Sequence, residues 1–76
     1  MEYNKEKVDE MALALLHLTS FSSDAGVRAW KGLEWDTMER LFNKGYISNP
    51  KSKSKSVLLT EQGAKLSEEM FKKYCC

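Results

Sequence analysis

The residues best suited to chemistry in this chain are cations gathered in one stretch. Between Arg40 and Thr60 the sequence holds five basic residues and no acidic one, although the whole chain has 12 Lys and Arg against 11 Asp and Glu. Such a local excess of positive charge suits an anionic partner even where the net charge is only +1. The alternative is a solvated turn whose lysines serve solubility, and the sequence leaves both interpretations open.

Two elements must position these cations. The first is a helix expected at about Asp36–Lys44, because Asp36 and Glu39 match a capping box and Gly45 follows as a helix-ending residue. Its outward face is expected to carry Thr37, Arg40, Asn43 and Lys44. The second is a polar segment in which serines alternate with Lys51, Lys53 and Lys55. Phosphate contact needs cations on a flexible arm rather than base-reading geometry, so lysines suit it.

The other chemistry-bearing residues do not form a recognisable catalytic or metal site. Cys75 and Cys76 end the chain, and two thiols with the distant His17 do not supply the four ligands of a zinc site. The sequence has no glycine-rich phosphate loop, and 76 residues leave little room for a closed pocket. We therefore expect no enzyme, no cofactor and no metal, and we interpret the cysteines as free thiols in a reducing, cytoplasmic setting.

The first helix is expected at about Asn4–Thr19, with Asn4 as its N-cap. A period of 100° per residue puts Val8, Met11, Ala12, Leu15 and Thr19 on its core face. The same period puts Glu6, Glu10, Leu13 and His17 on the outward face. Leu13 is the apolar exception there, and a partner would cover it.

The segment Ser20–Gly32 is expected to be mainly loop, with a short strand at Val27–Lys31. Within it, basic residues flank Trp30, an arrangement that can stack bases. A place in the core or at its edge is the favoured alternative for Trp30, because a large aromatic ring in a small domain is usually needed there.

The remaining elements are a hairpin and a terminal helix. Strands are expected at Tyr46–Ser48 and Ser56–Leu59. The last helix is expected at about Glu61–Tyr74 with Thr60 as its N-cap. Gly63, in its first turn, indicates close approach to a neighbouring element.

Length and hydropathy bound the organisation of the chain. A sequence of 76 residues predicts a single domain, 1–76. The longest apolar stretch, Met11–Leu16, is far shorter than the roughly 20 residues of a membrane span. The polar stretch Met1–Glu10 does not read as a signal peptide, so we expect no membrane partner.

A helix ending in L-F-N-K-G-Y-I, then a polar hairpin, then S-V-L-L-T-E-Q-G resembles the winged helix-turn-helix regulators, especially the MarR-type repressors. The resemblance covers about Trp35–Tyr74. It implies an α+β, winged-helix-like fold of three helices and a short β-hairpin, the wing. It also implies that the helix Asp36–Lys44 faces duplex DNA, that the three wing lysines rest on phosphates, and that the terminal helix is a place for a homodimer or protein contact.

Two features depart from that pattern. Only 15 residues, Phe21–Trp35, stand where a winged helix has an additional helix before its recognition helix. The sequence pI of 7.7 is also low, because DNA-binding domains typically have a pI above about 9.

The whole chain, with R-A-W-K-G-L-E-W-D at its middle, also resembles a family of small bacterial proteins of unknown function.

Two functions therefore stand as hypotheses. One is a non-enzymatic, transcription-related or nucleic-acid-binding module that uses the helix and the basic wing. The other is a protein-interaction or self-assembly module that uses its helical faces and binds no nucleic acid.

Overall fold

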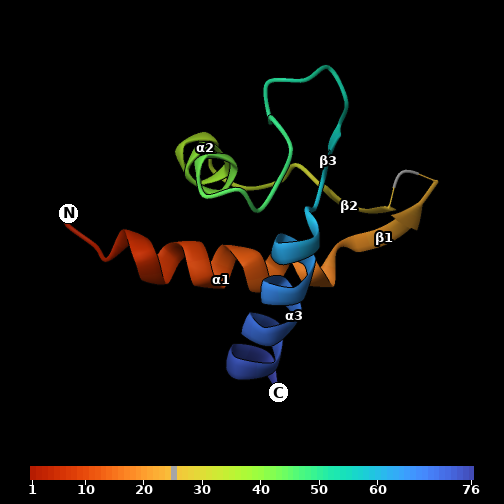
Figure 1. Ribbon diagram of the computed structural model, residues 1–76. Coiled ribbons are helices and arrows are strands. Elements are labelled where there is room, and N and C mark those ends of the chain that lie inside the picture. Colours follow the sequence, from red (N-terminus) through yellow and green to blue (C-terminus); the bar gives the residue numbers. More distant parts are fainter. Residues whose placement is uncertain (25) are drawn as a thin grey trace.

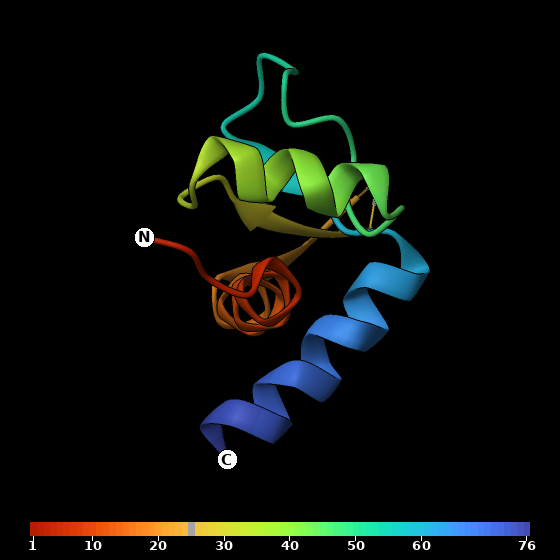
Figure 2. The same ribbon diagram turned by 90° about the vertical axis from the view of Figure 1, so that its left-hand side faces the viewer.

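The computed structural model of the protein describes residues 1–24 and 26–76. Within them the chain forms three helices and a three-stranded antiparallel sheet, an α+β fold consistent with the winged-helix type that the sequence predicts. The elements are α1 (Lys5–Leu18), β1 (Ser20–Ser23), β2 (Gly26–Trp30), α2 (Trp35–Asn43), β3 (Ser56–Leu58) and α3 (Glu61–Cys75). α1 crosses the molecule between α2 and α3, and the long α2–β3 connection projects away from α3 (Figures 1 and 2).

The core joins the three helices to one face of the sheet. On β2, the core-facing Val27 and Ala29 alternate with Arg28 and Trp30, so the second pair points to the opposite side. Phe21 pairs directly with Arg28 and shares that outer face of the sheet. The largest fully buried apolar side chains are Leu13, Leu16, Met38, Leu41, Ile47 and Val57.

The segment after α1 forms a hairpin. Its second strand, β2, confirms the short strand expected at Val27–Lys31, whereas the serines before it form β1 and not the expected loop. β1 pairs with β2 from Ser20 opposite Ala29 to Ser23 opposite Gly26, and Gly26 adopts a φ of 122° that a side chain would disfavour. The serines suggested a loop, yet pairing with β2 satisfies their backbone groups. This hairpin occupies the part of the sequence where a winged helix has its additional helix.

The expected strand at Tyr46–Ser48 is reduced to one bridge, between Ile47 and Leu59. The pairing stops because the backbone N–H of Leu58 donates to the Ser48 hydroxyl, at 2.9 Å, and not to a backbone carbonyl. Pro50, two residues on, has no N–H to extend the ladder. The wing is therefore a long loop closed by β3 and not a two-stranded ribbon.

α1 begins as expected, because the Asn4 side chain accepts from the Lys7 N–H at 3.1 Å. The assignment of its faces was only partly right: Ala12 is buried as expected, but Leu13, Met11 and Leu15 were assigned to the wrong sides. Leu13 is only 2% exposed, whereas Met11 and Leu15 are 49% and 48% exposed. Apolar residues occur around most of this helix, so periodicity alone could not choose the face that α3 covers.

α2 differs from its prediction at the start and agrees at the end. Its N-cap is Glu34, which forms no capping bond, so the predicted capping box from Asp36 to Glu39 is absent. At the other end Gly45, at a φ of 83°, donates to the Phe42 carbonyl, and the Tyr46 N–H donates to the Leu41 carbonyl. This pair of bonds is a Schellman motif and confirms Gly45 as the helix-ending residue.

α3 begins as predicted, because the Thr60 hydroxyl accepts from the Gly63 N–H at 2.9 Å. The close approach predicted for Gly63 is also confirmed, since a Cβ at this position would lie 1.9 Å from the Tyr46 carbonyl oxygen. Cys75 and Cys76 are free and exposed, as expected. In the part of the chain that the structure describes, no helix has the length and apolar character to cross a membrane.

One polar link ties the two long helices together. The Tyr74 hydroxyl of α3 donates a hydrogen bond to the Glu10 carboxylate of α1, and Lys73 lies 3.4 Å from the same oxygen. The hydrogen bond from Tyr74, followed by the charge of Lys73, holds the pKa of Glu10 below its ordinary value of 4.5. The same bond raises the pKa of Tyr74.

This link predicts a specific loss of stability in acid. A carboxyl whose folded-state pKa is depressed stabilises the fold above pH 4.5, and that contribution is lost as the pH falls through the folded-state pKa. Glu10→Gln should therefore flatten the decline of the thermal midpoint between about pH 6 and about pH 2. Glu69→Gln, an exposed carboxylate elsewhere on α3, is the control and should follow the wild-type curve. Equal declines for wild type and Glu10→Gln would contradict this role.

Candidate nucleic-acid interface

The three wing lysines, Lys51, Lys53 and Lys55, lie on the exposed loop between α2 and β3. Ser52 and Ser54, which lie between them, are also exposed, but the serines of this segment accept hydrogen bonds from the sheet and the residue after it. Ser54 and Ser56 accept hydrogen bonds from Arg28 of β2, and the Ser52 carbonyl accepts from Lys31 Nζ at 2.8 Å. These bonds anchor a loop whose three lysines are exposed to solvent.

Arg28 and Lys31 add two cations to this surface that the sequence analysis did not assign to it. Arg28 donates from Nε to the Ser56 hydroxyl at 2.7 Å and from a terminal nitrogen to the Ser56 carbonyl at 2.9 Å. The backbone N–H of Lys31 donates to the Lys55 carbonyl at 3.0 Å. These acceptors are neutral, so the bonds orient Arg28 and Lys31 without cancelling their charge.

We call this surface the cationic face. Its cations are Arg28, Lys31, Lys51, Lys53 and Lys55, and its aromatic members are Phe21 and Trp30. In residues 1–24 and 26–76, none of the five cations forms an ion pair with a carboxylate. Its positive charge is therefore directed to solvent and to any anion that reaches it.

The aromatic pair lies on the outer face of the sheet. The rings of Phe21 and Trp30 are 4.9 Å apart between centroids at an interplanar angle of 32°. Trp30 is 54% exposed, so the favoured expectation of a core-edge residue was wrong. The pattern R-x-W-K on an alternating strand was the available signal, because it places Arg28 and Trp30 on one side.

The cations predicted on α2 are engaged within the protein. Arg40 and Lys44 both pair with Asp9 of α1, at 2.9 and 2.7 Å, and Lys44 also pairs with Glu6. Asp9 is 2% exposed, and a carboxylate that deeply buried requires paired charge. The expected outward position of these two cations is therefore corrected.

Thr37 is also misplaced in the prediction, since it is buried and its hydroxyl donates to Glu34 at 3.1 Å. Asn43 is exposed as expected. The exposed side chains of α2 are Trp35, Asp36, Phe42 and Asn43. This face thus presents an acid and two aromatic rings where an acid-free polar surface was expected.

Asp9, Arg40, Lys44 and Glu6 form one cluster of ion pairs, the Asp9 cluster, which affects the pKa of Lys44. Partial burial acts to lower the pKa of its ammonium, but the hydrogen bonds to Asp9 and Glu6 outweigh burial and raise the pKa above 10.5. Lys44 is therefore a fully charged partner of Asp9 at neutral pH. Its charge supports the contact between α1 and α2.

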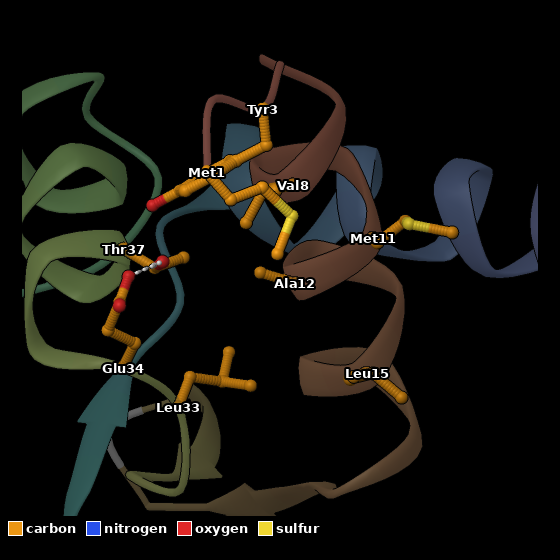
Figure 3. A pocket seen from close by; sticks show the side chains of 9 residues that line it. All are labelled: Met1, Tyr3, Val8, Met11, Ala12, Leu15, Leu33, Glu34 and Thr37. Carbon is orange, nitrogen blue, oxygen red and sulfur yellow. Dashed lines mark hydrogen bonds between the residues drawn. The ribbon is translucent and has the colours of Figure 1, made fainter. Parts of the chain in front are cut away.

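No group of three or more His, Cys, Asp or Glu side chains within the described residues has a metal-binding arrangement. An apolar groove of about 510 Å³ lies beside α1. It lies between α1 and the segment leading into α2 (Figure 3). The polar surface suited to a charged partner is the cationic face.

The chain thus has a small α+β fold, consistent with the winged-helix type, and carries a cationic loop. The sequence matches the profile of a domain of unknown function, DUF6429, over residues 4–76. It is also 44% identical over 73 residues to the uncharacterized protein y4hR of Sinorhizobium fredii (strain NBRC 101917 / NGR234), a match that covers 96% of this chain and 95% of that protein.

The chain belongs to the DUF6429 family. This confirms the resemblance to a family of small proteins of unknown function. Neither match names the MarR-type regulators, so that resemblance stays a prediction. No solved structure matches the chain.

Proposed function

We propose that this protein binds nucleic acid through its cationic face, with phosphates on the wing lysines. The observation that carries the proposal is the bonding of Arg28 and Lys31 to neutral acceptors beside three exposed lysines. Cations held in this way keep their full attraction for phosphate. The proposal therefore keeps the role in phosphate contact that the sequence-based hypothesis gave to the wing lysines.

α2 has a different place in this proposal from the one the sequence suggested. Arg40 and Lys44 are neutralised by Asp9 and Glu6, and Asp36 adds a negative charge to the exposed side of the helix. A helix with that surface is poorly suited to the major groove of duplex DNA. The recognition of bases therefore falls to the outer face of the sheet.

The exposed ring of Trp30 is the reason to expect that the protein prefers single strands to duplexes. Its half-exposed ring, supported by Phe21, offers a platform on which an unpaired base can stack. Bases within a duplex are already stacked and do not reach such a ring. We therefore expect tighter binding to a single strand than to a duplex of the same sequence.

The test is fluorescence anisotropy with a labelled oligonucleotide of about 20 nucleotides, single-stranded or annealed, at low salt. Lys53→Glu/Lys55→Glu should weaken binding to both forms by about tenfold or more, because two phosphate contacts become repulsive. The control is Lys65→Glu/Lys72→Glu, which makes the same change in net charge on α3. It should change affinity by less than about threefold.

A further variant separates stacking from charge. Trp30→Ala should weaken single-strand binding by about fivefold or more and leave duplex binding nearly unchanged. Equal losses in the wing and α3 double variants would reduce the interaction to non-specific attraction by net charge. Absence of wild-type binding at low salt would leave the alternative hypothesis, a protein-interaction module.

A further inference from the structure

An apolar stripe runs along the side of α1 that the core does not use. Val8, Met11, Leu15 and Leu18 are spaced three, four and three residues apart, which is the a/d spacing of a heptad repeat. Met11 and Leu15 are about half exposed, and Leu18 is 65% exposed. When two helices pair, apolar stripes of this spacing are buried in the contact between them. On α1, by contrast, Met11, Leu15 and Leu18 are exposed to solvent.

The arrangement of the elements leaves this side of α1 open. Figure 2 looks along α1, with α2 above it and α3 to one side, and no helix or strand of the described residues on the remaining side. We define the α1 stripe as Val8, Met11, Leu15 and Leu18. Met11, Leu15 and Leu18 are its exposed members, and Val8 lines the adjoining groove. The misassigned faces of α1 thus have a physical basis, since both sides of the helix are apolar.

The stripe adjoins a groove that can receive side chains. Val8 and Ala12 point from α1 toward Leu33, and Met1 folds back at one end (Figure 3). The groove has a volume of about 510 Å³. A second hollow of about 250 Å³ shares Leu15 and Leu33 with it and continues to Leu18 and Trp30. Together they form one continuous apolar surface.

We infer that two copies of this chain pair through their α1 stripes, antiparallel, about a two-fold axis between Met11 and Leu15. Two apolar stripes of heptad spacing pack against each other, so the exposed stripe of one copy can be buried by the same stripe of a second copy. All four stripe residues are uncharged, so the stripe itself brings no ion into the contact. This inference does not rest on the proposed function.

The available area fits a stable dimer. Five large apolar side chains on this surface are each about half exposed or more: Met1, Tyr3, Met11, Leu15 and Leu18. Covering them removes on the order of 600 Å² per copy from water, which approaches the ~800 Å² per partner of a standard interface. Small domains with limited cores commonly gain stability by association in this way.

The antiparallel direction follows from the helix ends. It sets the positive N-terminal end of one α1 beside the negative C-terminal end of the other, whereas a parallel pair sets like ends together. Val8 of one copy then faces Leu18 of the second, and Met11 faces Leu15. Leu18 of the second copy therefore lies at the mouth of the groove.

The first test is sedimentation equilibrium of the full chain under reducing conditions, which keeps Cys75 and Cys76 from forming covalent dimers. Over about 10–300 µM, the wild type should show a mass of twice the 8.7 kDa chain. Leu18→Glu should be a folded monomer by circular dichroism. Trp35→Glu, an exposed aromatic on α2, should remain a dimer. A monomeric wild type, or a dimeric Leu18→Glu, would overturn the inference.

The second test distinguishes the direction of pairing. Leu18→Glu mixed with Val8→Lys should form a heterodimer, because the new carboxylate faces the new ammonium only when the helices run antiparallel. Each variant alone should be mainly monomeric, because in its own antiparallel dimer the new charge would face the apolar side chain of Val8 or of Leu18. Failure of the mixture to associate, with both variants folded, would rule out the antiparallel arrangement.

Discussion

Replacing Gly63 with alanine should lower the free energy of unfolding by about 3 kcal/mol or leave the protein unfolded. The added Cβ would lie 1.9 Å from the carbonyl oxygen of Tyr46 and 2.7 Å from the carbonyl carbon. These are backbone atoms, so no side-chain rotation relieves the overlap. The first turn of α3 must therefore move away from the segment that follows α2.

The movement would break bonds that hold this junction together. The Thr60 N–H donates to the Tyr46 carbonyl at 3.0 Å, and the Thr60 hydroxyl donates to the Gly45 carbonyl at 2.7 Å. The measurement is urea denaturation followed by circular dichroism. Gly32→Ala is the matched control, because nothing lies within 4 Å of its added Cβ, and it should change stability by less than about 1 kcal/mol. Similar midpoints for both variants would contradict the packing described for Gly63.

Replacing Asp9 with asparagine should lower the free energy of unfolding by about 2–4 kcal/mol. The substitution keeps the size of a side chain that is 3% exposed but leaves Arg40 and Lys44 without their shared counter-charge. Both cations retain some contact with solvent, which places the expected cost below that of a fully enclosed pair. The loss should be seen in the urea midpoint with an unchanged m-value.

Two variants check that the cost comes from the buried cluster. Glu6→Gln removes the exposed partner of Lys44 and should cost less than about 0.5 kcal/mol. Asp9→Asn combined with Arg40→Gln should cost less than the sum of the two single changes, because either single change already removes the ion pair between these two residues. Additive losses would mean that Asp9 and Arg40 act independently.

Signals in the sequence predicted the helix termini well because they are local. Asn4, Gly45 and Thr60 each act on groups within a few residues, and the structure confirms all three. Gly63 was predicted to mark a close approach between elements, because a glycine in the first turn of a helix rarely has another structural role. The failure of Asp36 as a cap shows the limit of such signals, since the chain enters α2 through Glu34 instead.

The features that sequence reasoning missed depend on contacts between distant residues. The strand Ser20–Ser23 exists because β2 supplies its pairing partner, and the buried face of α1 is chosen by α3. Asp9 lies 31 residues from Arg40 in sequence, so their pairing leaves no local trace. The same pairing removed two residues from the predicted site.

The candidate site was therefore predicted in part. The wing lysines are exposed where the alternating sequence placed them, and the serines anchor the loop. Arg28 and Lys31 were considered only as the basic neighbours of Trp30, because they precede the acid-free stretch and only the sheet brings them beside the wing. Their addition moves the proposed interface from α2 to β2 and the wing.

The central claim, that the cationic face binds phosphates, is tested most directly by the salt dependence of wild-type binding to a single strand. With about three to five phosphate contacts, a plot of log affinity against log salt concentration should fall with a slope of about −2 to −3.5. Folded wild-type protein that shows no binding at low salt, or an affinity unchanged by salt, would contradict the claim.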